Sequence, residues 1–150
     1  MSVLRRWAEA ALGVPLTTER RDALYTRLTA GLDEHAALPR VLDAVVHGTE
    51  KAGALLAAQG MFLVVAIFAV DHGWPRDLCV PANLLLIGAA LIVTTNLRST
   101  SPTHDPDDPR PISHQAFDVL YSRNIRFNIA LYFTFLSITL LAAAAVYTAL

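Results

Sequence analysis

The sequence predicts an all-α integral membrane protein with three transmembrane helices, and three observations support this prediction. Two stretches, 52–70 and 127–150, contain no charged side chain. Each can cross the roughly 30 Å hydrocarbon layer, because a helix rises about 1.5 Å per residue. A third apolar run, 78–93, lies between them, and basic residues alternate across the runs as three crossings require. We expect the first and third spans to extend into the cytosol, preceded by an amphipathic helical N-terminal region.

Composition supports this class. The chain is 54% hydrophobic and 17% charged, with a mean hydropathy of +0.43, whereas soluble domains are about 45–50% apolar even when glycine is counted. The net charge of −1 gives no general attraction to nucleic acid, so we expect no nucleic acid polymer as a partner. The single cysteine, Cys79, cannot form an internal disulfide and fits a small apolar position at a membrane boundary.

The N-terminal region, 1–51, is expected to be cytoplasmic and helical. Residues 3–12 form a short amphipathic segment. Residues 17–38 place Leu24, Leu28 and Leu32 four apart, which predicts one mixed-charge helix with a single apolar stripe and a threonine N-cap. Such a stripe must cover another helix, another subunit or the membrane surface, and mixed charge favours protein over lipid.

The first membrane helix is expected to start in the cytosol at Pro39, because proline suits a first helical position, and to continue to Gly73. The predicted transmembrane hairpin covers 52–97, with spans at about 52–71 and 78–97 packed antiparallel around a tight turn. Trp74 in that turn is expected to anchor at the membrane interface. Pro81 and Asn83 weaken the apolar character of the second span, but proline is tolerated near the start of a helix.

The segment 98–113 contains four prolines within 100–111 and several aspartates, which predicts an irregular cytoplasmic loop. A helix is then expected over 114–150 with Ser113 as its N-cap, becoming the third span at about 127–149. Arg123 and Arg126 immediately before that span are expected to anchor it at the cytoplasmic interface.

The basic residues predict the orientation. Seven of the twelve precede the first span, one lies between the first and second, and four lie between the second and third. Short loops rich in lysine and arginine stay cytoplasmic, so we expect a cytoplasmic N-terminus and an extracytoplasmic C-terminus. Omitting the middle span would place four arginines outside, so this count supports that span independently of its hydropathy.

Small residues in the first span predict close helix packing. They lie about four apart and let another helix backbone approach; the predicted helix-packing residues are Gly53, Ala54, Ala57, Ala58 and Gly60. Helix association is the expected use, and three spans in one chain cannot enclose a channel alone.

Polar residues inside the spans have two possible uses. The main ones are Gln59, Asn83, Asn128 and Ser137, and Thr134 belongs to the same group. They can hydrogen-bond between helices, at about 0.6 kcal/mol per contact, or line a water-filled path. We favour interhelical bonding, because no span carries an ionisable group.

No constellation predicts an enzyme, a metal site or a cofactor. Asp43, His47 and Glu50 share one helix face, but a metal site in a bundle needs ligands from several helices. Asp105, Asp107 and Asp108 lack the glycine and distal glutamate of a calcium loop. No phosphate-binding glycine loop, nucleophile elbow or zinc-peptidase helix is present in the sequence.

The order of parts resembles the Pycsar effector transmembrane family and its SLATT-type relatives. The resemblance lies in EKAGALLAAQG at 50–60, a short hairpin, a polar cytoplasmic stretch, and YSRNIRFN at 121–128 leading into the last span. It implies an oligomeric effector of an antiphage system in the bacterial inner membrane. Such an effector disrupts the membrane when a cyclic nucleotide made by a partner cyclase accumulates.

A second hypothesis is a structural or assembly subunit of a larger membrane complex. That subunit would dock through the small-residue face of the first span and through the cytoplasmic helices. A nucleotide cyclase encoded next to this chain would favour the effector, and respiratory or secretion genes would favour the subunit.

Overall fold

The computed structural model describes residues 17–98 and 110–150, and this part of the chain is all-helical. Its helices are α2 (Thr18–Leu28), α3 (Glu34–Asp71), α4 (Arg76–Arg98) and α5 (Ile112–Ala149). Three of them, α3, α4 and α5, are long and apolar enough to cross a membrane. The predicted all-α fold with three spans is therefore confirmed. The expected amphipathic segment at 3–12 and most of the expected loop at 98–113 lie outside the described residues.

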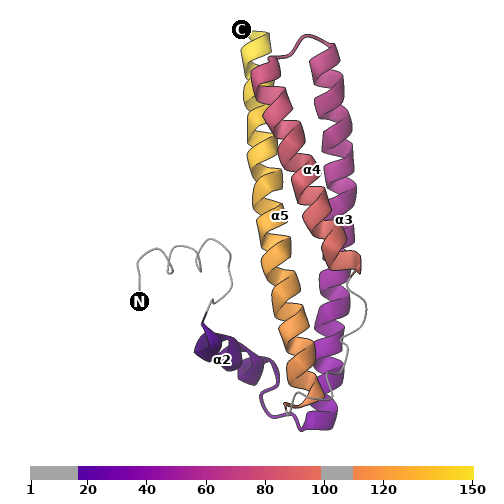
Figure 1. The fold of residues 1–150 in the computed structure, drawn as a ribbon, viewed down its shortest axis with the longest axis vertical. Helices are drawn as coiled ribbons and strands as arrows, with labels where there is room; N and C mark the ends of the chain where they lie inside the picture. Colours follow the sequence, from indigo (N-terminus) through magenta and orange to yellow (C-terminus); the bar gives the residue numbers. More distant parts are fainter. Residues whose placement is uncertain (1–16, 99–109) are drawn as a thin grey trace.

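The three long helices form one elongated bundle (Figure 1). α4 runs antiparallel to α3 and packs against both α3 and α5, as predicted for the first two spans. α3 and α5 run parallel and continue beyond the end of α4 as a two-helix extension. α2 lies beside the tip of that extension, at the end of the bundle far from the C-terminus.

The core of the bundle consists of small side chains that repeat at intervals of three and four residues. On α4 the buried apolar residues are Cys79, Ala82, Leu86, Ala89 and Val93. On α5 the buried residues of the span are Ala130, Thr134, Ser137, Leu141 and Ala144. Because the spacing alternates between three and four residues, one face of each helix stays turned toward its neighbours, as in left-handed coiled coils. Because most of these side chains are small, the helix backbones can approach closely.

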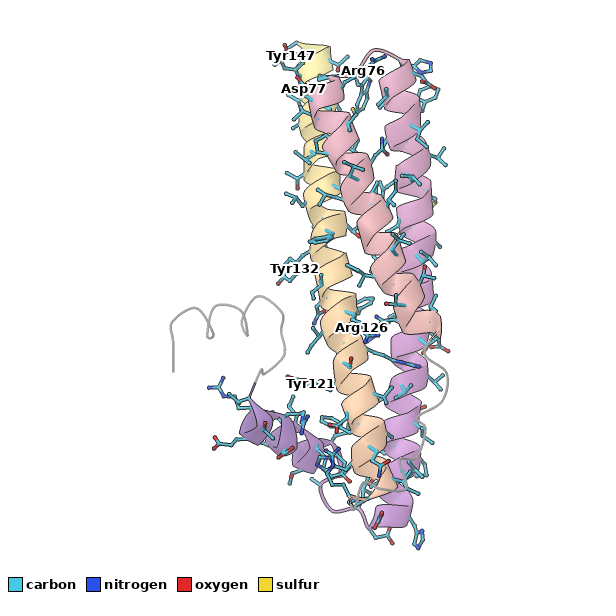
Figure 2. All side chains as sticks on the ribbon, in the orientation of Figure 1. Arg76, Asp77, Tyr121, Arg126, Tyr132 and Tyr147 are labelled. Carbon is cyan, nitrogen blue, oxygen red and sulfur yellow. The ribbon has the colours of Figure 1, made fainter. Side chains whose placement is uncertain are left out.

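The charged residues bound an apolar belt on the bundle. The nineteen residues of α3 from 52 to 70 carry no charge and extend about 28 Å at roughly 1.5 Å per residue. In Figure 2, Arg76, Asp77 and Tyr147 lie at one end of the bundle, and Arg126 lies past the middle, on the side of α2. The belt therefore matches the roughly 30 Å hydrocarbon layer.

The N-terminal helices differ from the expectation of one helix over 17–38. Thr17 caps α2 as predicted, its side chain accepting from the Arg20 N–H at 3.4 Å, but α2 ends at Leu28. Gly31 then adopts a φ of 76°, a left-handed conformation that glycine takes without steric cost. Asp33 caps the next helix by accepting from the Ala36 N–H at 2.8 Å. Leu32 therefore lies in the turn, and the predicted leucine stripe does not continue through it.

Two predicted helix starts were wrong by a few residues. α3 begins at Glu34, with Pro39 inside the helix rather than at its first position. The Asp33 cap moves the start upstream, and a proline this close to the start costs few backbone bonds. α5 begins at Ile112 with Pro111 as its N-cap residue and no side-chain cap bond. Ser113 is not the cap, because its hydroxyl is instead hydrogen-bonded to Tyr25.

Candidate functional site: the outer face of α3 and the boundary pocket

The predicted small-residue face of α3 points away from the other helices. Ala54, Ala57 and Gly60 are exposed, and Gly53 and Ala58 are half-buried. A Cβ added at Gly53 or Gly60 would meet no atom within 4 Å. These positions are therefore not needed for packing inside the chain.

α3 uses a different set of residues to pack on its partners. Ala52, Gln59, Ala66 and Ala69 are buried against α4 and α5. Only 17% of the most apolar window of α3 is buried, compared with 28% for each of the other spans. α3 is thus the span with the most surface left for lipid or for another chain.

Three of the polar residues inside the spans, Gln59, Thr134 and Ser137, take part in interhelical hydrogen bonds. Gln59, 1% exposed, donates from Nε2 to Thr134 Oγ1 at 2.8 Å. Thr134 in turn donates to the backbone oxygen of Ala130 at 2.8 Å. Ser137 donates from Oγ to the backbone oxygen of Ala82 at 2.8 Å. The first bond joins α3 to α5 and the last joins α5 to α4, which is the bonding use that the sequence favoured.

Asn83 contributes differently. It is half-buried, and its Oδ1 atom has no hydrogen-bond partner among residues 17–98 and 110–150. The Gln59 Oε1 atom also has no hydrogen-bond partner within that part of the chain. Asn128 lies near the end of the span that faces α2 and lines a pocket there.

That pocket lies where α3, the end of α4 and α5 meet at the boundary of the apolar belt. It has a volume of about 250 Å³, and its polar lining consists of Thr49, Lys51, Asn96, Arg123, Asn124 and Asn128. Arg123 donates from Nη1 to Thr49 Oγ1 at 3.3 Å. Asn96 donates from Nδ2 to the backbone oxygen of Arg123 at 3.1 Å. These bonds connect all three helices around the pocket.

The predicted interface anchors separate into three environments. Arg123 is half-buried in the pocket, whereas Arg126, three residues later, is exposed. Trp74 lies at the other end, partly buried against the core cluster that contains Ala69 and Cys79. The turn that holds it depends on Gly73, whose φ of 83° favours glycine.

The sequence did not indicate the cluster that holds α2. The Tyr25 hydroxyl lies 2.6 Å from Ser113 Oγ, and its ring centroid lies 4.4 Å from that of His114. Asp118 pairs with Arg110 at 2.8 Å and with Arg21 at 3.4 Å. Polar residues on a helix predict a solvated face when their partners are not known. Tyr25 and its partner Ser113 are 88 residues apart in the sequence.

The Asp43 and His47 side chains lie 3.9 Å apart and are about two-thirds exposed. Among the described residues, no group of three or more His, Cys, Asp or Glu side chains gathers as a metal site would require. The structure therefore brings these residues to a solvated surface of α3.

Comparisons with models of known protein families, with curated proteins and with solved structures found no significant match to this chain. The resemblance to Pycsar and SLATT-type effectors stays a hypothesis. The site itself must therefore support any functional proposal.

Proposed function

We propose that this chain is a non-enzymatic protein of the bacterial inner membrane that works as an oligomer assembled through the outer face of α3. Its N-terminus lies in the cytosol and its C-terminus outside, since seven of the twelve basic residues precede the first span and four lie between the second and third. Within this class we favour a nucleotide-triggered antiphage effector that disrupts the membrane.

The outer face of α3 is the observation that carries the assembly proposal. Ala57 and Gly60 are exposed, Gly53 beside them is half-buried, and all three are small, so this helix surface permits close backbone contact with another helix. The exposed residues of α4 include Leu84 and Leu91, large side chains that suit acyl chains. The small-residue face is thus a feature of α3 that lipid contact alone does not require.

The absence of charged residues in the spans argues against one class of membrane protein, the coupled transporters. Residues 52–70, 78–97 and 127–150 contain no Asp, Glu, Lys, Arg or His. Coupled transporters place ionisable relay residues near the bilayer midplane, so this chain does not fit that class. One copy has only three helices, which pack around a core of alanines. Disruption of the bilayer therefore requires an assembly of several copies.

We expect Ala57→Leu combined with Gly60→Leu to prevent oligomer formation. The two leucines fill the face on which another helix would approach, and the Gly60 position has open space around its Cβ, so the fold is retained. Light scattering after size-exclusion chromatography in mild detergent gives the mass of each variant. The wild type is expected as an oligomer and the double variant as a monomer.

The matched control is Leu84→Phe combined with Leu91→Phe, which adds bulk at exposed positions on α4, outside this face. This control protein should elute as the wild type does. An oligomer of unchanged mass in the Ala57→Leu, Gly60→Leu protein would contradict the proposed interface. A wild-type mass that includes a different polypeptide would instead favour the assembly subunit.

We expect bacteria that produce this chain together with the partner nucleotide cyclase that this proposal requires to lose their membrane potential. A voltage-sensitive dye measures the loss, with antibody detection to match expression levels. The Ala57→Leu, Gly60→Leu protein should leave the potential intact because it does not assemble. A stable potential in cells that contain the assembled wild type and an active cyclase would refute the effector and leave the assembly subunit.

A further inference from the structure

The boundary pocket has a chemical character that the oligomeric function does not explain. Two of its lining residues, Lys51 and Arg123, are cationic, and no acidic residue lines it among the described residues. Thr49, Asn124 and Asn128 add neutral hydrogen-bonding groups. Charge-assisted hydrogen bonds from Lys and Arg are strong contacts for phosphate oxygens. The lining therefore favours an anionic oxygen-rich ligand.

The pocket also has an apolar side. Val45, Leu120 and Phe127 line it together with the polar residues. Lys51 and Arg126 mark the cytosolic boundary of the apolar belt, so the pocket lies at the depth of the phosphate layer of a bilayer. A ligand that is anionic at one end and apolar at the other fits both sides.

Lys51 has no ion pair within residues 17–98 and 110–150. Its neighbour Glu50 is exposed and does not line the pocket. Arg123 alone would be explained as a brace, because it bonds to Thr49 across two helices. Lys51 has no such structural partner in that part of the chain and is exposed, so its charge is available to a ligand at the pocket.

We propose that this pocket binds the phosphate of an anionic phospholipid from the cytoplasmic leaflet. Lys51 and Arg123 contact the phosphate, and the apolar lining contacts the glycerol and the first acyl carbons. Basic pockets between membrane helices on the cytoplasmic side are known to hold such headgroups. The volume of about 250 Å³ lies just below the roughly 300–1,000 Å³ of pockets for drug-sized ligands, so the pocket can hold a headgroup but not a whole lipid.

The test is a titration of delipidated full-length protein with phosphatidylglycerol in neutral detergent, with bound lipid counted by native mass spectrometry. Lys51→Gln with Arg123→Gln removes the charge but leaves the pocket open. Gly48→Leu fills the pocket but keeps the charge, and a Cβ at Gly48 would meet no atom within 4 Å. The two variants therefore test electrostatics and shape separately.

We expect the charge variant to bind phosphatidylglycerol about 25-fold more weakly, at roughly fivefold per cation. Gly48→Leu should weaken binding by about tenfold or more through steric exclusion. Arg126→Gln, on the same helix but outside the pocket, is the charge control. Val46→Phe, exposed on α3, is the steric control. Both controls should stay within about fivefold of the wild type, the effect of one surface charge.

Several outcomes would overturn the proposal. Equal binding by Gly48→Leu and the wild type would show that lipid associates with surface charge and not with the pocket. Equal retention of phosphatidylcholine and phosphatidylglycerol would remove the anionic requirement. Displacement of the lipid by inorganic phosphate or a cyclic mononucleotide at micromolar concentration would assign the pocket to a soluble ligand. None of these measurements depends on oligomer mass or membrane potential. The lipid proposal can therefore be wrong while the proposed function is right, and the reverse.

Discussion

Ala89→Phe is expected to destabilise the bundle by about 3 kcal/mol, the upper end of the usual cost of overpacking a core. Ala89 is fully buried and belongs to a cluster with Ala52 of α3, Val93 of α4 and Ala130 of α5. A phenyl ring at this position cannot fit without separating at least two of the three helices. Protein interiors are close-packed, so neighbouring small side chains offer no space into which the ring can move.

The measurement is the midpoint of unfolding in mixtures of mild detergent and sodium dodecyl sulfate. The matched control is Leu84→Phe on the same helix, where the side chain is 65% exposed and faces away from the bundle. That variant should unfold within about 0.5 kcal/mol of the wild type, as substitutions away from packed sites usually do. Equal midpoints for the two phenylalanine variants would mean that the helices do not pack through Ala89.

The architecture of the spans could be predicted from the sequence because one physical requirement dominates it. In lipid every backbone polar group must be satisfied internally, so long uncharged segments have little choice other than helices. The same segments do not determine which helix face turns inward. On α3 the sequence drew attention to Gly53, Ala57 and Gly60, but the intrachain face contains Ala52, Gln59 and Ala66. Alanines occur on both faces, so composition alone could not separate them.

Local hydrogen bonds decided the helix boundaries outside the membrane. The stripe through Leu24 and Leu28 predicted a helix that continued past Leu32, but Gly31 and the Asp33 cap divide it. A prediction from periodicity extends a helix for as long as apolar residues recur. In the structure the helices instead begin and end at turn and cap residues. Aspartate is among the residue types that cap helices, so the pair of Gly31 and Asp33 within the leucine pattern is the local signal of this break.

The boundary pocket combines residues that no linear pattern could group. Thr49, Lys51 and Arg123 come from two helices that run parallel, and Asn96 comes from the end of a third. The sequence indicated Arg123 and Asn128 as polar residues at the start of the third span, without indicating that they face the same pocket. Knowledge of the helix register was needed, and register is a property of packing.

Tyr25→Ala is expected to release α2 from the rest of the protein. α2 has no buried residue, so its attachment depends on a few partly exposed contacts. Tyr25 supplies a hydroxyl 2.6 Å from Ser113 Oγ and a ring with its centroid 5.5 Å from that of Phe117. An isolated helix of 11 residues is marginal in water, so a detached α2 should also lose its helical structure.

Hydrogen–deuterium exchange of the amides in α2 measures this release. Loss of the ring and the hydroxyl should cost about 2 kcal/mol, which corresponds to about 30-fold faster exchange. Tyr25→Phe keeps the ring but leaves the buried Ser113 hydroxyl without this partner, so an intermediate increase of about fivefold is expected. Amides in the transmembrane part of α5 should exchange as in the wild type in both variants, because they lie far from α2 (Figure 1).

The control for a general effect on α2 is Leu24→Ala, which shortens the preceding, 39% exposed side chain. It should leave exchange nearly unchanged, because Tyr25 and Leu28, and not Leu24, are the residues of α2 that pack against the cluster of Val41, Ala116 and Phe117. Asp118→Asn tests the ionic part of the attachment, since Asp118 pairs with Arg21 and Arg110. Its effect should be smaller than that of Tyr25→Ala and should disappear at high salt, because partly exposed ion pairs are weak and screened. If Leu24→Ala and Tyr25→Ala accelerated exchange equally, the tyrosine would not be the contact that holds α2 in place.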